Sequence, residues 1–248
     1  MLNNQITFRR VAAGTLLILA PLLQFIAVLV DPGTWGDDHE TVSFGDNPAL
    51  AQAQSALYHW SWILTAVAAF GLLHLARRYT VNGVAGQPAG KGLSVLANIG
   101  GTLTVVGYIN LSALLLIDPV EWWFGQHYPP DQAGKLVDEV LNLPGVIFGF
   151  QMPWAFVGLV GLPLLAVAVW RARFIGWWVP ALVAVGYIVP FVVPYGPVTV
   201  FFWAVPVIAL GAVGVRVLRM GDAAWAAYYP AVPAPGRTTP DSYANTTA

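Results

Sequence analysis

The sequence contains no cysteine among its 248 residues, and only 9% of its side chains are charged. The absence of cysteine excludes disulfides, thiolate metal sites, cysteine nucleophiles and thiol redox chemistry. Typical soluble domains have about 25% charged residues, so a soluble chain of this composition would lack the polar surface that keeps it dispersed. The net charge of −1 also argues against a basic face that neutralises phosphates. We therefore expect no nucleic-acid partner.

Other site types are also missing from the sequence. It has four histidines, and no two of them lie at the i, i+4 spacing that binds a metal from one helix face. A Gly-rich phosphate loop and a nucleophile elbow are both absent. No Asp, Glu, Lys or Arg falls inside the long apolar stretches, which argues against ion-coupled transport. We expect neither a metal nor a cofactor.

What the sequence does contain is long apolar stretches, in a chain that is 57% hydrophobic. About 20 helical residues cross a hydrocarbon core that is about 30 Å thick. Six stretches of this kind predict an all-α fold, a polytopic integral membrane bundle of six helices formed by residues 1–220. The predicted helices cover residues 11–30, 49–76, 92–117, 143–169, 175–193 and 197–217.

The charged residues alternate between the connections of these helices. Ten of the eleven Lys and Arg residues fall on one side, at positions 9–10, 77–91, 171–173, 216–219 and 237. Ten of the twelve Asp and Glu residues fall on the other side, at positions 31–46 and 118–139. Because cytoplasmic loops retain Lys and Arg, the pattern predicts a multi-pass cell-membrane protein with both termini in the cytoplasm.

One connection and the C-terminal segment show recognisable sequence patterns. Residues 131–141 place apolar side chains at helical spacing, which predicts a short amphipathic helix on the outer side. Residues 221–248 are rich in Pro, Ala and Thr without an apolar period, which predicts a disordered cytoplasmic tail.

Polar and aromatic residues gather at one predicted depth in the bilayer. Measured from the nearest basic residue at 1.5 Å per residue, Gln24 and Tyr187 lie about 21 Å up, and His59, Asn110 and Gln151 about 27–30 Å up. Buried polar groups in a membrane are costly unless they pair with each other or line a wet cavity. One interpretation is therefore hydrogen bonding between helices. The other is a chamber in the outer half that binds a small apolar or lipid-like molecule of isoprenoid type. The candidate ligand-binding residues are Gln24, His59, Trp60, Asn110, Trp122, Trp123, Gln151, Trp154, Tyr187 and Trp203.

Two carboxylic acids suggest a second hypothesis. Asp118 and Glu121 lie beside Trp122 and Trp123 at the outer end of a predicted helix. A carboxylic acid that is shielded from water can act as a general acid, and aromatic faces stabilise cations. In this chemistry the Trp-rich outer half resembles a membrane terpene cyclase. The resemblance implies a cofactor-independent lyase or isomerase in which Asp118 or Glu121 is the catalytic acid. A third hypothesis is a non-catalytic subunit of a membrane complex, with a protein partner in the bilayer.

Overall fold

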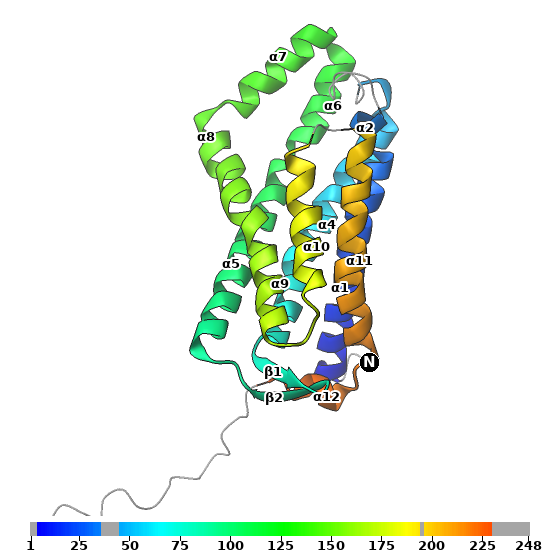
Figure 1. The fold of residues 1–248 in the computed structure, drawn as a ribbon. Coiled ribbons are helices and arrows are strands. Elements are labelled where there is room, and N and C mark those ends of the chain that lie inside the picture. Colours follow the sequence, from blue (N-terminus) through cyan, green and yellow to red (C-terminus); the bar gives the residue numbers. More distant parts are fainter. Residues whose placement is uncertain (1–3, 36–44, 194–195, 230–248) are drawn as a thin grey trace, which may run out of the picture.

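The protein is represented by a computed structural model that describes residues 4–35, 45–193 and 196–229. Its long helices run side by side along one axis (Figure 1). They are α1 (Gln5–Val30), α4 (Pro48–Leu75), α5 (Lys91–Leu114), α9 (Leu159–Arg171) and α11 (Pro197–Arg219). A shorter helix, α10 (Trp178–Ile188), is extended by the 3-10 turn η3 (Val189–Phe191).

Shorter elements close the two ends of the bundle. At one end lie α2 (Pro32–Trp35), α6 (Ile117–His127), α7 (Pro130–Leu141) and α8 (Pro144–Val146). At the other end lie β1 (Arg78–Val81), β2 (Val84–Pro88) and α12 (Asp222–Ala226). Between α8 and α9 the chain forms two π-helical turns, η1 (Ile147–Gln151) and η2 (Trp154–Gly158).

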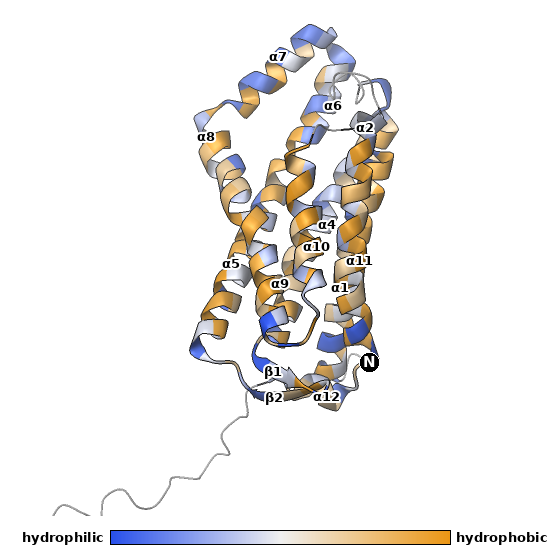
Figure 2. Cartoon of the chain, viewed as in Figure 1, coloured by the Kyte–Doolittle hydropathy of each residue, from blue (hydrophilic) through white to orange (hydrophobic). Residues whose placement is uncertain are grey.

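The apolar length of the helices identifies the chain as a helical bundle of membrane type. Five segments of the described chain are long and apolar enough to cross a membrane: Gln5–Val30, Pro48–Leu75, Lys91–His127, Pro144–Arg171 and Pro197–Arg219. The sixth predicted segment, 175–193, contains only the shorter apolar helix Trp178–Phe191. Hydrophobic residues cover the middle of the bundle and hydrophilic ones gather at its ends (Figure 2).

The first residues of α1 and α4 suit the starts of helices. Asn4 caps α1, because its side chain accepts hydrogen bonds from the backbone N–H groups of Ile6 and Thr7. Pro48 occupies the first turn of α4, where its missing N–H costs nothing. The first helix therefore begins six residues earlier than predicted, at Gln5 instead of residue 11, and α4 starts and ends within one residue of the prediction.

The structure differs from the sequence prediction in two places. The predicted helical bundle also carries a small β-hairpin that was not predicted, in which Asn82 and Gly83, both at positive φ, turn β1 back into the antiparallel β2. Residues 221–229 are not a disordered tail, since α12 forms and Trp225 and Tyr228 are buried. These aromatic residues find partners on other helices, which the local composition could not reveal. Residues 230–248 of the predicted tail lie outside the described residues.

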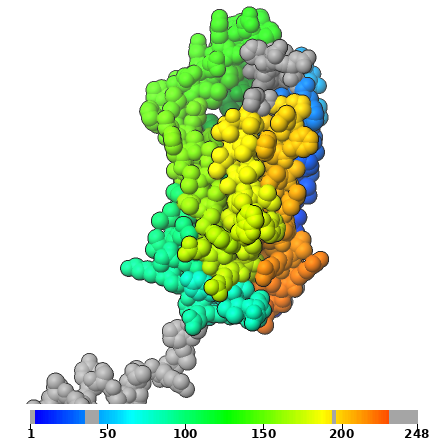
Figure 3. Space-filling view, viewed as in Figure 1, coloured from blue at the N-terminus to red at the C-terminus, as the bar shows by residue number. Residues whose placement is uncertain are grey.

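The connection at residues 117–141 is helical throughout most of its length. The predicted amphipathic helix at 131–141 is confirmed as α7, which buries Ala133 and Val137. Before it, α6 continues almost directly from α5 and carries Asp118 in its first turn. In the space-filling view the surface is hollowed beneath the arch that α7 and α8 form near the end of α10 (Figure 3).

The helices pack in two groups that α4 and α10 join. α1 lies between α4 and α11, whereas α5 packs on α9, and α10 fits between α9 and α11. Gly107 of α5 lies so close to Gly158 that a Cβ at position 107 would stand 2.2 Å from the Cα of Gly158. Small residues allow this approach of two backbones, which is the usual way in which membrane helices gain contact area.

The two ends of the bundle carry opposite charge. The basic side chains of α1, β1, α5, α9 and α11 lie at the end that holds the β-hairpin, which we call the basic end. The acidic residues of α6 and α7, with Asp31, lie at the other end, which we call the acidic end. Lys135 and Asp222 are exceptions among the described residues.

Candidate functional site

One face of α4 carries a column of inward-pointing side chains that runs from the acidic end toward the middle of the bundle. Gln54, Tyr58, Trp62 and Thr65 follow one another at intervals of three or four residues, and all four are buried. This spacing places them on one helix face. Two groups of residues from other helices meet this column.

The first group is a set of buried polar residues at the acidic end, which we call the acid group: Asp31, Gln54, Asp118 and Glu121. The Nε2 atom of Gln54 donates to Oδ2 of Asp118 at 3.3 Å and, in a longer contact, to Oδ2 of Asp31 at 3.5 Å. Glu121 lies three residues after Asp118 on α6, which puts both carboxylates on one side of that helix. The end of α1 and helix α6 thus bring three carboxylates into the interior, where Gln54 of α4 bonds to two of them.

The orientation of the Gln54 side-chain amide within the acid group follows from its hydrogen bonds. Carboxylates accept hydrogen bonds, so the amide NH₂ of Gln54 faces Asp31 and Asp118. Its Oε1 atom accepts a 3.1 Å hydrogen bond from the Ser55 hydroxyl. Asp31 also accepts from the backbone N–H of Gly33 at 2.9 Å, which fixes the turn between α1 and α2.

Below the acid group lies the second set, which we call the aromatic core: Tyr58, Trp62, Tyr108, Tyr187 and Trp203. The Trp62 and Tyr108 rings are stacked, with centroids 5.0 Å apart and planes 9° apart. Trp203 approaches Trp62 edge-on at 5.7 Å. The Tyr108 hydroxyl and Nε1 of Trp203 are buried and make no hydrogen bond within the described part of the chain. Four helices therefore contribute aromatic faces to one compact cluster.

Gln24 closes the aromatic core from α1. Its Oε1 atom accepts a 2.8 Å hydrogen bond from the Tyr187 hydroxyl, and its Nε2 atom donates to Thr65 Oγ1 at 3.1 Å. Thr65 in turn donates to the carbonyl of Ser61 at 2.9 Å. This chain satisfies the polar atoms of Gln24 inside the bundle and ties α1, α4 and α10 together.

A separate hollow lies on the outside of α4, α5 and α6, and we call it the α4–α6 groove. Its volume is about 770 Å³, and it is lined by Ala51, Gln52, Ser55, Ala56, His59, Trp60, Ser112, Ala113, Leu115, Leu116, Pro119, Trp122 and Phe150. His59 Nδ1 is 2.9 Å from the Ser112 hydroxyl, so Nε2 is the ring nitrogen left for a ligand. Nε1 of Trp122 is buried without a partner among the described residues.

The predicted ligand-binding residues are thus divided between these two places. Three of them, His59, Trp60 and Trp122, line the groove. Another three, Gln24, Tyr187 and Trp203, belong to the interior with the aromatic core.

The remaining four lie apart from both sets. Trp123 stacks on His127 at the surface of α6, and Trp154 packs on Phe191 at 4.6 Å. Gln151 donates to the carbonyl of Leu141 at 2.9 Å. Asn110 has a buried Oδ1 without a partner in the described residues. The structure therefore does not bring the ten residues into a single chamber.

Several contributing residues were not among the predicted site residues: Asp31 as a buried group, Gln54, Tyr58, Trp62, Thr65, Tyr108 and Ser112. The spacing of Gln54, Tyr58 and Trp62 on α4 could have revealed three of them, because large or polar side chains recur there on one face of an alanine-rich helix. Nothing in the local sequence distinguishes Ser112, whose importance comes from His59 on another helix.

Among the described residues, no cluster of three or more His, Asp or Glu side chains is arranged to hold a metal ion. Comparison of the whole chain with protein-family models, curated proteins and solved structures finds no match. The site is therefore interpreted from its own geometry.

Proposed function

We propose that the protein binds a small apolar or lipid-like molecule in the α4–α6 groove. The observation that carries the proposal is the groove itself, a hollow of about 770 Å³ with largely apolar walls and a few polar atoms. Pockets for small molecules typically measure about 300–1,000 Å³ and combine apolar walls with a few polar groups that orient the ligand. His59 and Trp122 supply such groups, and Trp60 supplies an aromatic face.

The ligand chemistry follows from the lining. Nε1 of Trp122 can only donate a hydrogen bond, and Nε2 of His59 can donate or accept one according to its tautomer. A hydrocarbon that carries one hydroxyl or carbonyl oxygen fits this combination. An isoprenoid alcohol or ketone is an example, whereas a charged nucleotide or sugar phosphate would find no cation in the lining.

Filling the groove tests this proposal. Ala56→Trp places an indole in the groove, and Ala53→Trp places the same group on α4 at an exposed position outside the lining. Mass spectrometry of the purified proteins should find a copurifying apolar molecule in wild type and in Ala53→Trp, and at least tenfold less of it in Ala56→Trp. Equal amounts in all three proteins would contradict the proposal.

A second candidate function is acid-catalysed cyclisation or isomerisation of an alkene. The observation that favours it is the burial of Asp118 and Glu121, with Asp118 bonded to Gln54, which lies one helical turn before Tyr58 of the aromatic core. In such a reaction a carboxylic acid gives its proton to one carbon of a double bond, and the neighbouring carbon becomes a cation. Aromatic faces stabilise that cation until a carboxylate removes another proton, so the enzyme is regenerated and no cofactor is consumed.

Solvent isotope labelling distinguishes this reaction from simple binding. Membranes that contain the protein would be incubated in D₂O with linear polyprenyl alcohols, and the products analysed for carbon-bound deuterium. Conversion should disappear in Asp118→Asn or Glu121→Gln and persist in Asp131→Asn, which changes an exposed acid on α7. Conversion that survives in both buried-acid variants would eliminate these residues as the catalytic acids.

We also propose that the chain crosses the cell membrane six times, with its basic end in the cytoplasm. The support is the partition of charge between the two ends together with the rule that cytoplasmic loops retain Lys and Arg. Association with another membrane protein stays a prediction, and copurification from mild detergent would test it.

A further inference from the structure

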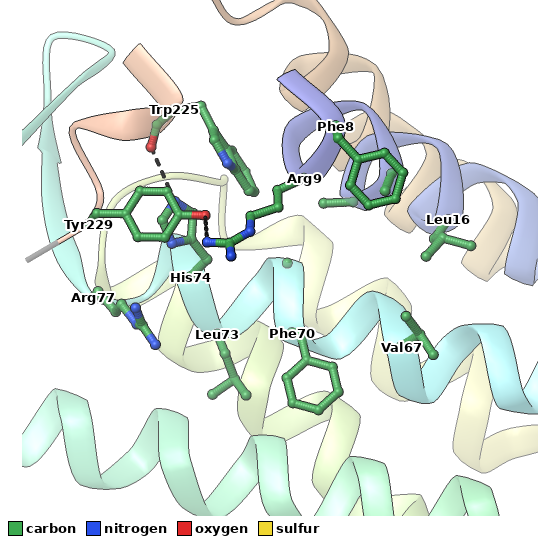
Figure 4. A pocket seen from close by; sticks show the side chains of 13 residues that line it. Phe8, Arg9, Leu16, Val67, Phe70, Leu73, His74, Arg77, Trp225 and Tyr229 are labelled. Carbon is green, nitrogen blue, oxygen red and sulfur yellow. Dashed lines mark hydrogen bonds between the residues drawn. The ribbon is translucent and has the colours of Figure 1, made fainter. Parts of the chain in front are cut away.

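A second hollow, which we call the basic-end groove, lies between α1 and α4 at the opposite end from the α4–α6 groove (Figure 4). Its volume is about 360 Å³. One side is apolar and formed by Phe8, Leu16, Val67, Phe70 and Leu73. Phe8 and Phe70 are 50% and 60% exposed, so this side is open to the surroundings of the bundle. In a membrane those surroundings are lipid chains.

The other side of the basic-end groove is cationic and aromatic. Arg9 and Arg77 line it together with His74, Trp225 and Tyr229. Arg9 donates to the Tyr229 hydroxyl at 3.3 Å and lies 5.8 Å from the centre of that ring. His74 donates from Nε2 to the carbonyl of Trp225 at 3.1 Å, which holds the segment that follows α11 against the groove.

The two arginines of the groove have no acidic partner among the described residues. The one ion pair within the described residues joins Arg10, the residue that follows Arg9, to Asp222 at 2.8 Å. Arg10 also donates to the carbonyl of Leu218, so both its charge and its donors are engaged. Arg9 points to a different side of α1, where the described chain supplies no carboxylate. The groove therefore combines two uncompensated cations with an apolar wall.

We propose that the basic-end groove binds one anionic phospholipid from the adjacent leaflet. Its phosphate would lie between Arg9 and Arg77, and an acyl chain would run along Phe8, Val67 and Phe70. Guanidinium groups bind phosphate oxygens through paired, charge-assisted hydrogen bonds. Basic pockets between membrane helices at the leaflet rich in anionic lipid suit such headgroups. The apolar wall selects a membrane lipid over a soluble phosphate, because a soluble ion would leave that wall without a partner. This site is independent of the proposed function of the α4–α6 groove.

Native mass spectrometry of delipidated full-length protein in a nonionic detergent tests the proposal. Dioleoyl phosphatidylglycerol should bind more tightly than dioleoyl phosphatidylcholine, with one preferred molecule per chain. Arg9→Gln and Arg77→Gln should each weaken phosphatidylglycerol binding about fivefold, the effect expected for one basic residue near an anionic headgroup. Arg219→Gln removes the same charge at an exposed position outside the groove and should leave the affinity unchanged.

Two further experiments distinguish lipid binding in the groove from nonspecific electrostatic attraction to the basic end. Ala12→Phe narrows the groove while keeping both arginines, and should reduce lipid binding as strongly as the arginine variants. Glycerol 3-phosphate at equal concentration should not displace the lipid. Equal affinity for both lipids, an Arg219→Gln effect as large as that of Arg9→Gln, or displacement by glycerol 3-phosphate would each overturn the proposal. Unchanged unfolding midpoints would show that the variants remain folded.

Discussion

The Tyr187 hydroxyl donates a 2.8 Å hydrogen bond to Oε1 of Gln24 in the interior of the bundle, where both residues are fully buried. Because Tyr187 belongs to α10 and Gln24 to α1, this bond joins the shortest of the apolar bundle helices to the first helix of the chain. Gln24 also donates to Thr65, so its loss would leave two hydroxyl groups on other helices with one partner fewer.

We expect Tyr187→Phe to lower the free energy of unfolding by about 0.5–1.5 kcal/mol, because it leaves Oε1 of Gln24 buried without a donor. The matched control is Tyr108→Phe, which removes a buried hydroxyl that makes no hydrogen bond within the described chain. This control should be neutral or slightly stabilising. Chemical unfolding in detergent measures both, and equal destabilisation by the two variants would show that the Gln24 bond contributes nothing specific.

Close backbone contact between α5 and η2 makes a second prediction. A Cβ at Gly107 would lie 2.2 Å from the Cα of Gly158, and backbone atoms cannot move aside as a flexible side chain can. Gly107→Ala should therefore destabilise the bundle by at least about 1–3 kcal/mol. Gly211→Ala on α11 is the control, since nothing lies within 4 Å of its Cβ position. Thermal unfolding should show a gain for Gly211→Ala, because alanine restricts the unfolded chain more than glycine does.

The docking of α12 should depend on pH. Hydrogen bonds from Thr7 and then from Arg10 lower the pKa of Asp222 below its ordinary value of 3.8. The ionised form is therefore favoured in the folded protein. Its contribution to stability is complete above pH 3.8 and is lost as the pH falls through the lower folded pKa.

Comparison of wild type with Asp222→Asn isolates this contribution from other carboxylates. The difference between their unfolding midpoints should be constant at neutral pH and shrink toward zero as the pH falls below 3.8. A difference that does not vary with pH would mean that ionisation of Asp222 does not stabilise the folded state.

Orientation in the membrane can be tested cleanly because the natural chain has no cysteine. Gln132→Cys introduces one thiol on α7 at the acidic end, and Gln87→Cys introduces one on β2 at the basic end, both at exposed positions. A membrane-impermeant maleimide should label Gln132→Cys on intact cells and Gln87→Cys only after permeabilisation. The reverse pattern would place the basic end outside.

The position of a side chain along the bundle axis could be predicted from the sequence, whereas the neighbouring helix that it faces could not. Gln24 and Tyr187 were both placed about 21 Å above the nearest basic residues by counting 1.5 Å per residue, and they are hydrogen-bonded to each other. The same count put Gln151 near His59. Gln151 instead bonds to Leu141, because the count cannot tell which neighbour a helix face meets. The π-helical turns change that face further, since each adds a residue to a turn.

Local composition also misses contacts between distant segments. Residues 221–229 carry no apolar period, yet Trp225 lies 4.3 Å from the His74 ring and the Tyr228 hydroxyl is 2.7 Å from that of Thr80. Their order comes from partners about 150 residues away in the chain. Asp118 and Pro119 were likewise predicted to follow the end of a helix at residue 117. They instead lie in the first turn of α6, where proline is tolerated.

The short length of α10 has a consequence for how the protein enters the membrane during synthesis. Residues Trp178–Phe191 form 14 helical positions, which extend about 21 Å against a hydrocarbon core of about 30 Å. A segment of this length is a poor substrate for insertion as a separate span. The turn at Gly196 leads directly into α11, which is 23 residues long and packs against α10. We expect the two helices to leave the translocation channel together as a hairpin. Insertion of α11 would then carry α10 into the bilayer, and the hydrogen bond between Tyr187 and Gln24 would form afterwards.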